Sequence, residues 1–274
     1  MILDGHQHFW ALANPFTDWP TADLAPIHRD FLPSDFPAAA AVWGTILVQA
    51  APDRAETAWL LRLAQDHPLV RGVVGWADLA APDAPVQIAA LAQEPLLKGL
   101  RPMLQGLDDP RWILRADVAD GLDAMARHGL RLDALVRAPQ LPVIAQLAAR
   151  HPTLRIVLDH AGKPDIAGNG HATWARDLAA LSGHGNVWCK LSGLWTEAGG
   201  QTDDATIAPY VDEVLACFGP DRVIWGSDWP VLHLAGDYHD WLAQCRRLLS
   251  GFNETEQAQV FLHNGVGFYG LATS

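Results

Sequence analysis

The sequence predicts an α/β protein that folds as a single (β/α)8 barrel of the TIM type. Short apolar runs rich in β-branched residues recur along the 274 residues, and segments with apolar residues at i, i+3 and i+4 separate most of them. Most of the short runs do not alternate polar with apolar residues, which is typical of parallel strands buried on both faces. Eight strands that alternate with helices over this length indicate a barrel.

The expected strands are residues 2–9, 44–50, 70–79, 97–105, 130–136, 155–162, 187–193 and 222–230. Helical periodicity is clearest in residues 54–67, 141–151 and 205–218, and two closing helices are expected in residues 238–251 and 254–271. We expect one domain over residues 1–274.

One segment departs from this alternation. Residues 11–41, between the first two expected strands, are rich in Pro and Trp and far longer than a usual connection. Loops that follow the strands of such a barrel lie on its catalytic face. We therefore expect this insertion to form a wall or lid of an active site.

Composition excludes several classes of partner. A net charge of -12 offers no basic patch for nucleic acid or for an anionic membrane. No apolar run is long enough to span a bilayer, and no secretion signal is expected before the first strand. The three cysteines form no CxxC pair, which is typical of a cytoplasmic protein. No pattern predicts an oligomeric state.

Polar residues gather where the expected strands end. His6 and His8 lie two residues apart and so share one face of the first strand. Polar residues also lie at the end of, or within, six later strands: Gln49, Asp78, Arg101, Asp159, His160, Lys190, Ser192 and Asp228. Because an unpaired buried charge costs several kcal/mol or more, such convergence on one rim predicts an active site.

Structural interpretations remain open for single members of this set. His160 is equally consistent with a core histidine, and Asp228 with a cap on the following segment. Asp159 alternates in face with His160, which favours a structural hydrogen bond, and Lys190 shares a face with Ser192.

Several longer motifs carry a resemblance. They include "DGHQHFW" (4–10), "VVGWADL" (73–79), "KGLRPMLQ" (98–105), "VLDHAGKP" (157–164), "CKLSGLWTEA" (189–198) and "FGPDRVIWGSDWPV" (218–231). Over nearly its whole length the chain resembles the sugar-lactonase branch of the amidohydrolase superfamily. The resemblance implies a carboxylic-ester hydrolase that opens an aldonolactone, such as L-fucono- or L-rhamnonolactone, to the free acid. No residue pattern identifies the sugar or the ring size.

The catalytic residues expected from this resemblance are Asp228, as the general base on water, with His6, His8 and His160. The same four side chains could hold one divalent ion such as zinc. A two-metal centre is not expected, because the fifth strand offers no histidine and Lys98 stands at the beginning of its strand. The resemblance also implies that a metal is not strictly required.

The expected partner is a small-molecule sugar lactone. Arg101 and Lys163 are expected to bind its carbonyl or hydroxyl groups. Four tryptophans near strand ends are expected to stack against the sugar: Trp10, Trp76, Trp195 and Trp229. His28, on the insertion, is expected to contact it as well. Two alternatives remain open, a zinc-dependent decarboxylase of the same superfamily and a non-catalytic binder of sugar acids.

Overall fold

The computed structural model describes residues 1–38 and 41–272, and it confirms the predicted barrel. Eight parallel strands follow one another in chain order around the sheet. They are β1 (Leu3–Gln7), β2 (Gly44–Val48), β3 (Val70–Gly75), β4 (Leu97–Leu100), β5 (Arg131–Ala134), β6 (Ile156–Leu158), β7 (Val187–Leu191) and β8 (Val223–Trp225). A parallel bridge between Gln7 and Trp229 joins the end of β1 to the segment after β8. The amide of His8 donates to the carbonyl oxygen of Trp229 at 2.7 Å, which brings the first and last strands together.

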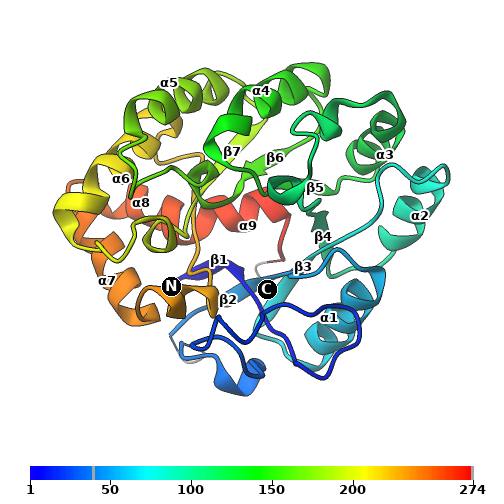
Figure 1. Ribbon diagram of the computed structural model, residues 1–274, viewed down its shortest axis with the longest axis horizontal. Helices are drawn as coiled ribbons and strands as arrows, with labels where there is room; N and C mark the ends of the chain where they lie inside the picture. The colour runs from blue at the N-terminus through cyan, green and yellow to red at the C-terminus, as the bar shows by residue number, and fades with distance from the viewer. Residues whose placement is uncertain (39–40, 273–274) are drawn as a thin grey trace.

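Most of the helices surround the strands on the outside of the barrel, and α9 (Asn264–Tyr269) lies across one end of it (Figure 1). In chain order the helices are α1 (Arg54–Asp66), α2 (Ala84–Leu91), α3 (Ala116–Arg127), α4 (Leu141–Arg150), α5 (His171–Ser182), α6 (Asp204–Phe218), α7 (Tyr238–Leu248), α8 (Glu254–Ala258) and α9. Among the described residues no helix is long and apolar enough to cross a membrane.

Local sequence explains where these helices begin and which face they bury. Asp53, Asp203 and Asp237 each cap a helix, and the side chain of each accepts a hydrogen bond from a backbone amide of the first turn. In α3, Val118, Leu122 and Met125 recur at helical spacing and are fully buried.

The segment after β1 takes the place of a first helix. In its described part the regular structure is one short 3-10 turn, Pro33–Asp35. Paired backbone hydrogen bonds between Trp10 and Phe31, both 2.9 Å, join the start of this segment to Phe31 further along it. The indole Nε1 of Trp10 donates to the carbonyl oxygen of Arg29 at 2.8 Å. This loop is therefore tied down by its own hydrogen bonds, and part of it lines the cavity described below.

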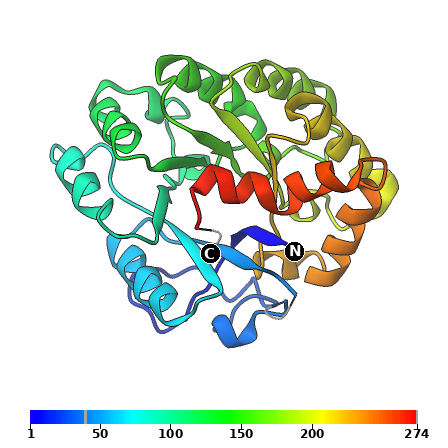
Figure 2. The same cartoon turned by 180° about the vertical axis from the view of Figure 1, so that it is seen from behind.

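The amino-terminal end of the barrel is closed by the last helices. Figure 2 shows α9 lying across this end, and Phe268, Tyr269 and Leu271 pack there in a second buried cluster with Leu3 and Ile224. A Cβ at Gly265 would lie 2.5 Å from Cδ2 of Leu3, so any larger residue there would displace the Leu3 side chain. The polar residues lie at the opposite end of the barrel, where the carboxyl ends of the strands meet.

Several strands are shorter than the sequence predicts. β3 ends at Gly75, β4 at Leu100, β6 at Leu158 and β8 at Trp225, so the polar residues that were expected at strand ends lie in the turns that follow. His160 and Asp228 have φ values of 54° and 59°, a left-handed conformation that ends an extended strand. These turns aim the polar side chains into the mouth of the barrel.

Candidate active site

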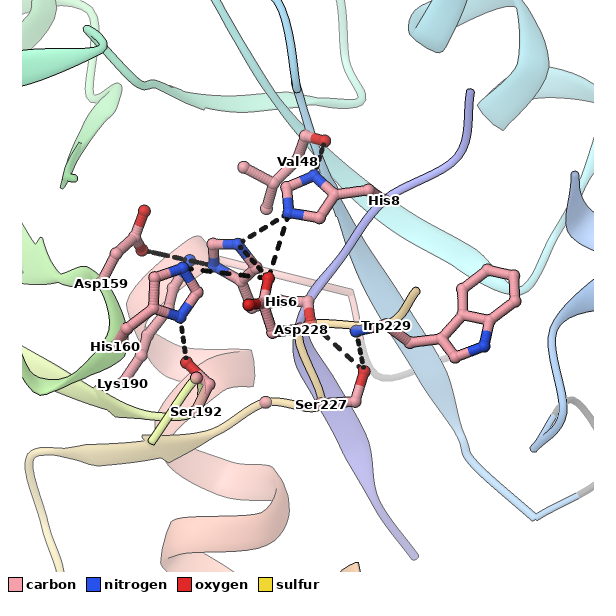
Figure 3. Close-up of polar contacts among 12 residues, drawn as sticks. His6, His8, Val48, Asp159, His160, Lys190, Ser192, Ser227, Asp228 and Trp229 are labelled. Carbon is pink, nitrogen blue, oxygen red and sulfur yellow. Dashed lines mark hydrogen bonds and ion pairs between the residues drawn. The ribbon is translucent and has the colours of Figure 1, made fainter. Parts of the chain in front are cut away.

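Asp228 is held in a tight turn directly after β8. The hydroxyl of Ser227 donates to Oδ2 of Asp4 at 2.6 Å and accepts from the amide of Trp229 at 2.9 Å. The amide of Asp228 itself donates to the carbonyl oxygen of His6 at 2.8 Å. A left-handed non-glycine residue costs about 1 kcal/mol or more and persists only when its surroundings fix it. The contacts of Ser227 supply that restraint (Figure 3).

Asp228 lies against both histidines of β1. Its Oδ1 is 3.3 Å from Nε2 of His8 and 3.6 Å from Nε2 of His6. The two Nε2 atoms are 3.2 Å apart. All three side chains are buried, so two ring nitrogens and one carboxylate oxygen converge with little exposure to solvent.

Hydrogen bonding settles which nitrogen of His8 carries a proton. Nδ1 of His8 lies 2.7 Å from the carbonyl oxygen of Val48, and a carbonyl oxygen can only accept. Nδ1 therefore carries the proton and donates it to Val48. In the neutral ring Nε2 is then left with a lone pair, and this lone pair faces His6 and Asp228.

His160 completes the group from the other side of the barrel mouth. Its Nδ1 is 2.9 Å from the hydroxyl oxygen of Ser192, which fixes the ring, and its Nε2 is 3.9 Å from Oδ1 of Asp228. The rings of His6 and His160 have their centres 4.5 Å apart. The structure thus brings together all four residues expected to be catalytic.

Burial governs the protonation of this group. It lowers the pKa of His160 to about 4 and lowers that of His8 as well. For His6, burial and the nearby Lys190 charge hold the pKa well below its usual value. Burial alone raises the pKa of Asp228, but His160, His8 and His6 outweigh it and keep that pKa below its ordinary value. Near neutral pH the site therefore holds an ionised carboxylate among neutral imidazoles.

A charged network lies behind His6, and its extent was missed in the sequence. Lys190, fully buried, has Nζ 3.0 Å from Nδ1 of His6, 3.0 Å from Oδ1 of Asp159 and 2.5 Å from Oδ2 of Asp133. The hydroxyl of Tyr269 donates to the same Oδ2 of Asp133 at 2.7 Å. Asp159 has more than a structural hydrogen bond, because it pairs with both Lys190 and Arg101. The sequence signal that could have identified Asp133 is its position as the one aspartate in the apolar run 130–136.

Arg101 bridges this network and the histidines. Its Nη1 lies 3.3 Å from Nε2 of His6 and 3.4 Å from Oδ2 of Asp159, and its Nη2 donates to the carbonyl oxygen of Gln49. Among the described residues its buried Nε has no hydrogen-bond partner. Arg101 therefore has a buried N–H group without a partner in the described part of the chain.

A cavity of about 510 Å³ opens over the group. His8, Arg101, His160, Lys163 and Asp228 line it, and Nζ of Lys163 is 3.1 Å from Oε1 of Glu197. The other wall is largely apolar and includes Trp19 and Leu24 of the insertion, with Met103, Leu135, Val231 and Leu234. Sequence reasoning missed these residues, since nothing in their local pattern sets them apart from packing residues.

None of the aromatic residues expected to contact a sugar lines this cavity. Trp10, Trp195 and Trp229 are buried, and their indole N–H groups donate to Arg29, Gln244 and His233, respectively. Figure 3 shows the ring of Trp229 pointing away from the histidines. Trp76 is half-buried and His28 is exposed, and neither lines the cavity. These side chains pack the loops, because large apolar rings gain more from burial than from partial exposure.

The donor atoms of His6, His8 and Asp228 fit a divalent metal. Two ligand nitrogens at tetrahedral zinc distances lie roughly 3.3 Å apart, close to the 3.2 Å observed between the two Nε2 atoms. Neutral imidazoles and an ionised carboxylate are the forms that bind zinc. His160 lies next to this set but is not within ligand spacing of all three atoms.

Comparisons with known proteins identify relatives of this chain. The family model described as Amidohydrolase matches residues 3–271. The chain is 45% identical over 274 residues to an L-fucono-1,5-lactonase of Burkholderia ambifaria, covering 97% of this chain and 94% of the relative. It is 38% identical to an L-fucono-1,5-lactonase of Burkholderia multivorans, covering 87% of this chain and 85% of the relative. A crystal structure of an amidohydrolase from Burkholderia multivorans with bound zinc superposes with a TM-score of 0.94 at 34% identity, covering 99% and 100% of the two chains.

Proposed function

This chain belongs to the amidohydrolase family, and we propose that it hydrolyses the lactone ring of a sugar acid, with L-fucono-1,5-lactone as its first candidate substrate. The observation that carries the chemistry is the buried, ionised carboxylate of Asp228 at the floor of the cavity. Two L-fucono-1,5-lactonases among its relatives support the choice of substrate.

Asp228 is the proposed general base. A water molecule above its carboxylate loses a proton to Asp228 as its oxygen attacks the lactone carbonyl carbon. The new C–O bond forms, the ring C–O bond then breaks, and the ring oxygen leaves as an alkoxide that takes the proton back from Asp228. The product is the open-chain hydroxy acid, and Asp228 is again ionised.

Arg101 is the proposed donor to the developing oxyanion. It lines the cavity, and its buried Nε–H has no partner among the described residues. A preorganised cationic donor in a buried site stabilises a developing negative charge far more than water does. Ser192 holds the ring of His160, so Nε2 of His160 is positioned as a second polar contact for substrate or water.

We further propose that His6, His8 and Asp228 can hold one divalent ion, since their donor atoms converge and are in the ligating form. When bound, such an ion would act as a Lewis acid toward the lactone carbonyl. The remaining groups do not depend on it, because Asp228 and Arg101 already offer a base and an oxyanion donor.

The cavity suits an uncharged sugar ring. Both of its cationic side chains in the described part of the chain already have carboxylate partners, Arg101 with Asp159 and Lys163 with Glu197. Hydroxyl groups can share such paired charges, whereas the carboxylate that a decarboxylase must bind would need a cation of its own. The apolar wall with Trp19 matches the CH face of a sugar.

The test is a pH-indicator assay across aldonolactones of both ring sizes, run beside elemental metal analysis. We expect turnover of L-fucono-1,5-lactone or a close relative. Asp228→Asn is expected to lower kcat by about 100-fold or more while product still binds. Turnover of no lactone would support the decarboxylase or the sugar-acid binder, and near-wild-type turnover by D228N would overturn the role of Asp228.

A further inference from the structure

A buried lysine lies directly behind the proposed metal ligand His6 (Figure 3). Nζ of Lys190 approaches three acceptors, Oδ2 of Asp133 at 2.5 Å, Oδ1 of Asp159 at 3.0 Å and Nδ1 of His6 at 3.0 Å. An ammonium group has three N–H donors and no acceptor. Each of its donors is therefore matched by one acceptor, and one of these acceptors is a ring nitrogen of His6.

The two nitrogens of His6 cannot be considered separately. If Nε2 is to bind a metal as part of a neutral imidazole, the proton of the ring must reside on Nδ1. Lys190 cannot accept that proton, so its contact favours a lone pair on Nδ1. Oδ1 of Asp159, 3.4 Å from Nδ1, is the neighbour that can accept it. Lys190 and Asp159 thus favour opposite tautomers of the same ring. Nη1 of Arg101, 3.3 Å from Nε2, favours the same tautomer as Asp159, because a guanidinium group has no acceptor.

We propose that Lys190 keeps the affinity of the His6, His8 and Asp228 site for a divalent cation low. The ammonium of Lys190 against Nδ1 favours a proton on Nε2 of His6, which the lone pair of His8 at 3.2 Å and Oδ1 of Asp228 at 3.6 Å can accept. It thereby opposes the preference that Asp159 and Arg101 set on the same ring. In the tautomer that Lys190 favours, the proton lies where a metal would otherwise bind. The inference rests on the proposed metal site and gives it a specific regulator.

The positive charge of Lys190 lowers the affinity for a divalent cation, as does the His6 tautomer that Lys190 favours. The buried network holds three carboxylates and two cations: Asp133, Asp159 and Asp228 with Arg101 and Lys190. Its net charge is therefore one negative, and loss of the ammonium makes it two negative. A divalent cation would neutralise the second arrangement, and charges act strongly at this depth because water does not screen them.

The decisive measurement compares two substitutions by zinc titration. Purified proteins stripped of metal are titrated against a chromophoric chelator, so the readout is the zinc Kd and not activity. Lys190→Met replaces the aliphatic part of the side chain with one of the same number of atoms, removes the ammonium, and is expected to tighten zinc binding by about tenfold or more. Asp159→Asn removes the acceptor for Nδ1–H and is expected to weaken it by about 10- to 100-fold. Damage to the fold would weaken binding in both variants, so the opposite signs are the signature.

Two further variants separate a specific effect of Lys190 on zinc binding from an effect of lost stability. Lys190→Met leaves buried carboxylates unpaired, which can cost several kcal/mol of stability. The pair Lys190→Met with Asp133→Asn removes one charge of each sign and restores the balance, and it is still expected to bind zinc more tightly than wild type. Lys98→Met is the matched control: Nζ of Lys98 donates to the carbonyl oxygen of Pro95 and its side chain does not line the cavity. Its zinc Kd is expected to stay within about threefold of wild type.

Each outcome decides something. A tighter Kd in both Lys190 variants, with a weaker one in D159N, supports the inference, as does zinc binding that appears only once Lys190 is replaced. Binding by wild type that does not tighten in either Lys190 variant overturns the inference and leaves the metal site standing. No zinc binding in wild type or in either Lys190 variant overturns both, while lactone turnover would still stand on its own assay.

Discussion

Oδ1 of Asp228 lies 3.3 Å from Nε2 of His8, a nitrogen that has no proton to donate because the proton of this ring goes to Val48. Two electron-rich atoms at this distance need something positive between them, which can be a proton of water, the Nε2–H of His6 or a metal ion. The same pair can therefore activate water or ligate a metal. Which of these dominates is what the first prediction measures.

Removal of metal is expected to leave much of the lactonase activity. Asp228 and Arg101 supply a base and an oxyanion donor without it, and Lys190 stabilises the metal-free form of His6. The measurement is kcat after dialysis against a chelator, with the metal content determined on the same sample. Complete loss of activity that zinc restores would instead identify an obligate mononuclear metalloenzyme.

Ser227→Ala is expected to lower both kcat and thermal stability. The change leaves the amide of Trp229 and the carboxylate of Asp4 without the Ser227 hydroxyl, at a cost of about 1–3 kcal/mol for each buried group left unpaired. The turn that aims Asp228 then loses its restraint, so kcat should fall more than KM changes.

The control for that variant is Ser182→Ala at the end of α5. The hydroxyl of Ser182 donates to the carbonyl oxygen of Ala179, and Ser182 does not line the cavity. It should lose stability while kcat stays at the wild-type value. Equal effects of the two changes on kcat would mean that Ser227 does not position Asp228.

Trp19→Ala is expected to raise KM for the lactone about fivefold with little change in kcat. Trp19 lines the apolar wall of the cavity, and an aromatic contact of this kind contributes about 1 kcal/mol. Trp195→Phe is the comparison, since Nε1 of Trp195 donates to Gln244 and the ring does not line the cavity. It should lower the melting temperature and leave KM unchanged. A KM that moves with Trp195 and not with Trp19 would place the sugar elsewhere.

Glu56 is expected to make stability fall as pH rises. Burial raises the pKa of Glu56 to about 7, although the amides of Ala50 and Ala51 donate to its carboxylate. The folded state then binds more protons than the unfolded state between about pH 4.5 and 7, so the free energy of unfolding decreases with pH across that range. The contribution is on the order of 3 kcal/mol.

The measurement is urea unfolding at about pH 5 and pH 8 for wild type and for Glu56→Gln. The glutamine cannot ionise, so the variant should lose less stability between the two pH values. An identical pH dependence in the two proteins would show that Glu56 does not titrate in this range.

Much of the fold was predictable from the sequence because it depends on local pattern. Unbroken apolar runs and helical periodicity identify strands and helices one at a time, and a regular alternation leaves few topologies to choose from. The same logic placed His6, His8, His160 and Asp228 at one end of the barrel, since the carboxyl ends of all eight strands meet there.

Only the tertiary structure could decide which side chains share the site. Lys190 and Asp133 are polar residues within buried strands, and the sequence does not reveal that they meet behind His6, because their contact joins β7 to β5. The tryptophans illustrate the reverse case: Trp10, Trp195 and Trp229 stand near strand ends and yet pack inward, whereas Trp19 reaches the cavity from the insertion. The periodicity of a sequence predicts which residues of one helix or strand are buried. Which side chains meet in a site depends on how strands and loops far apart in the sequence pack together, and the packing of the whole barrel decides this.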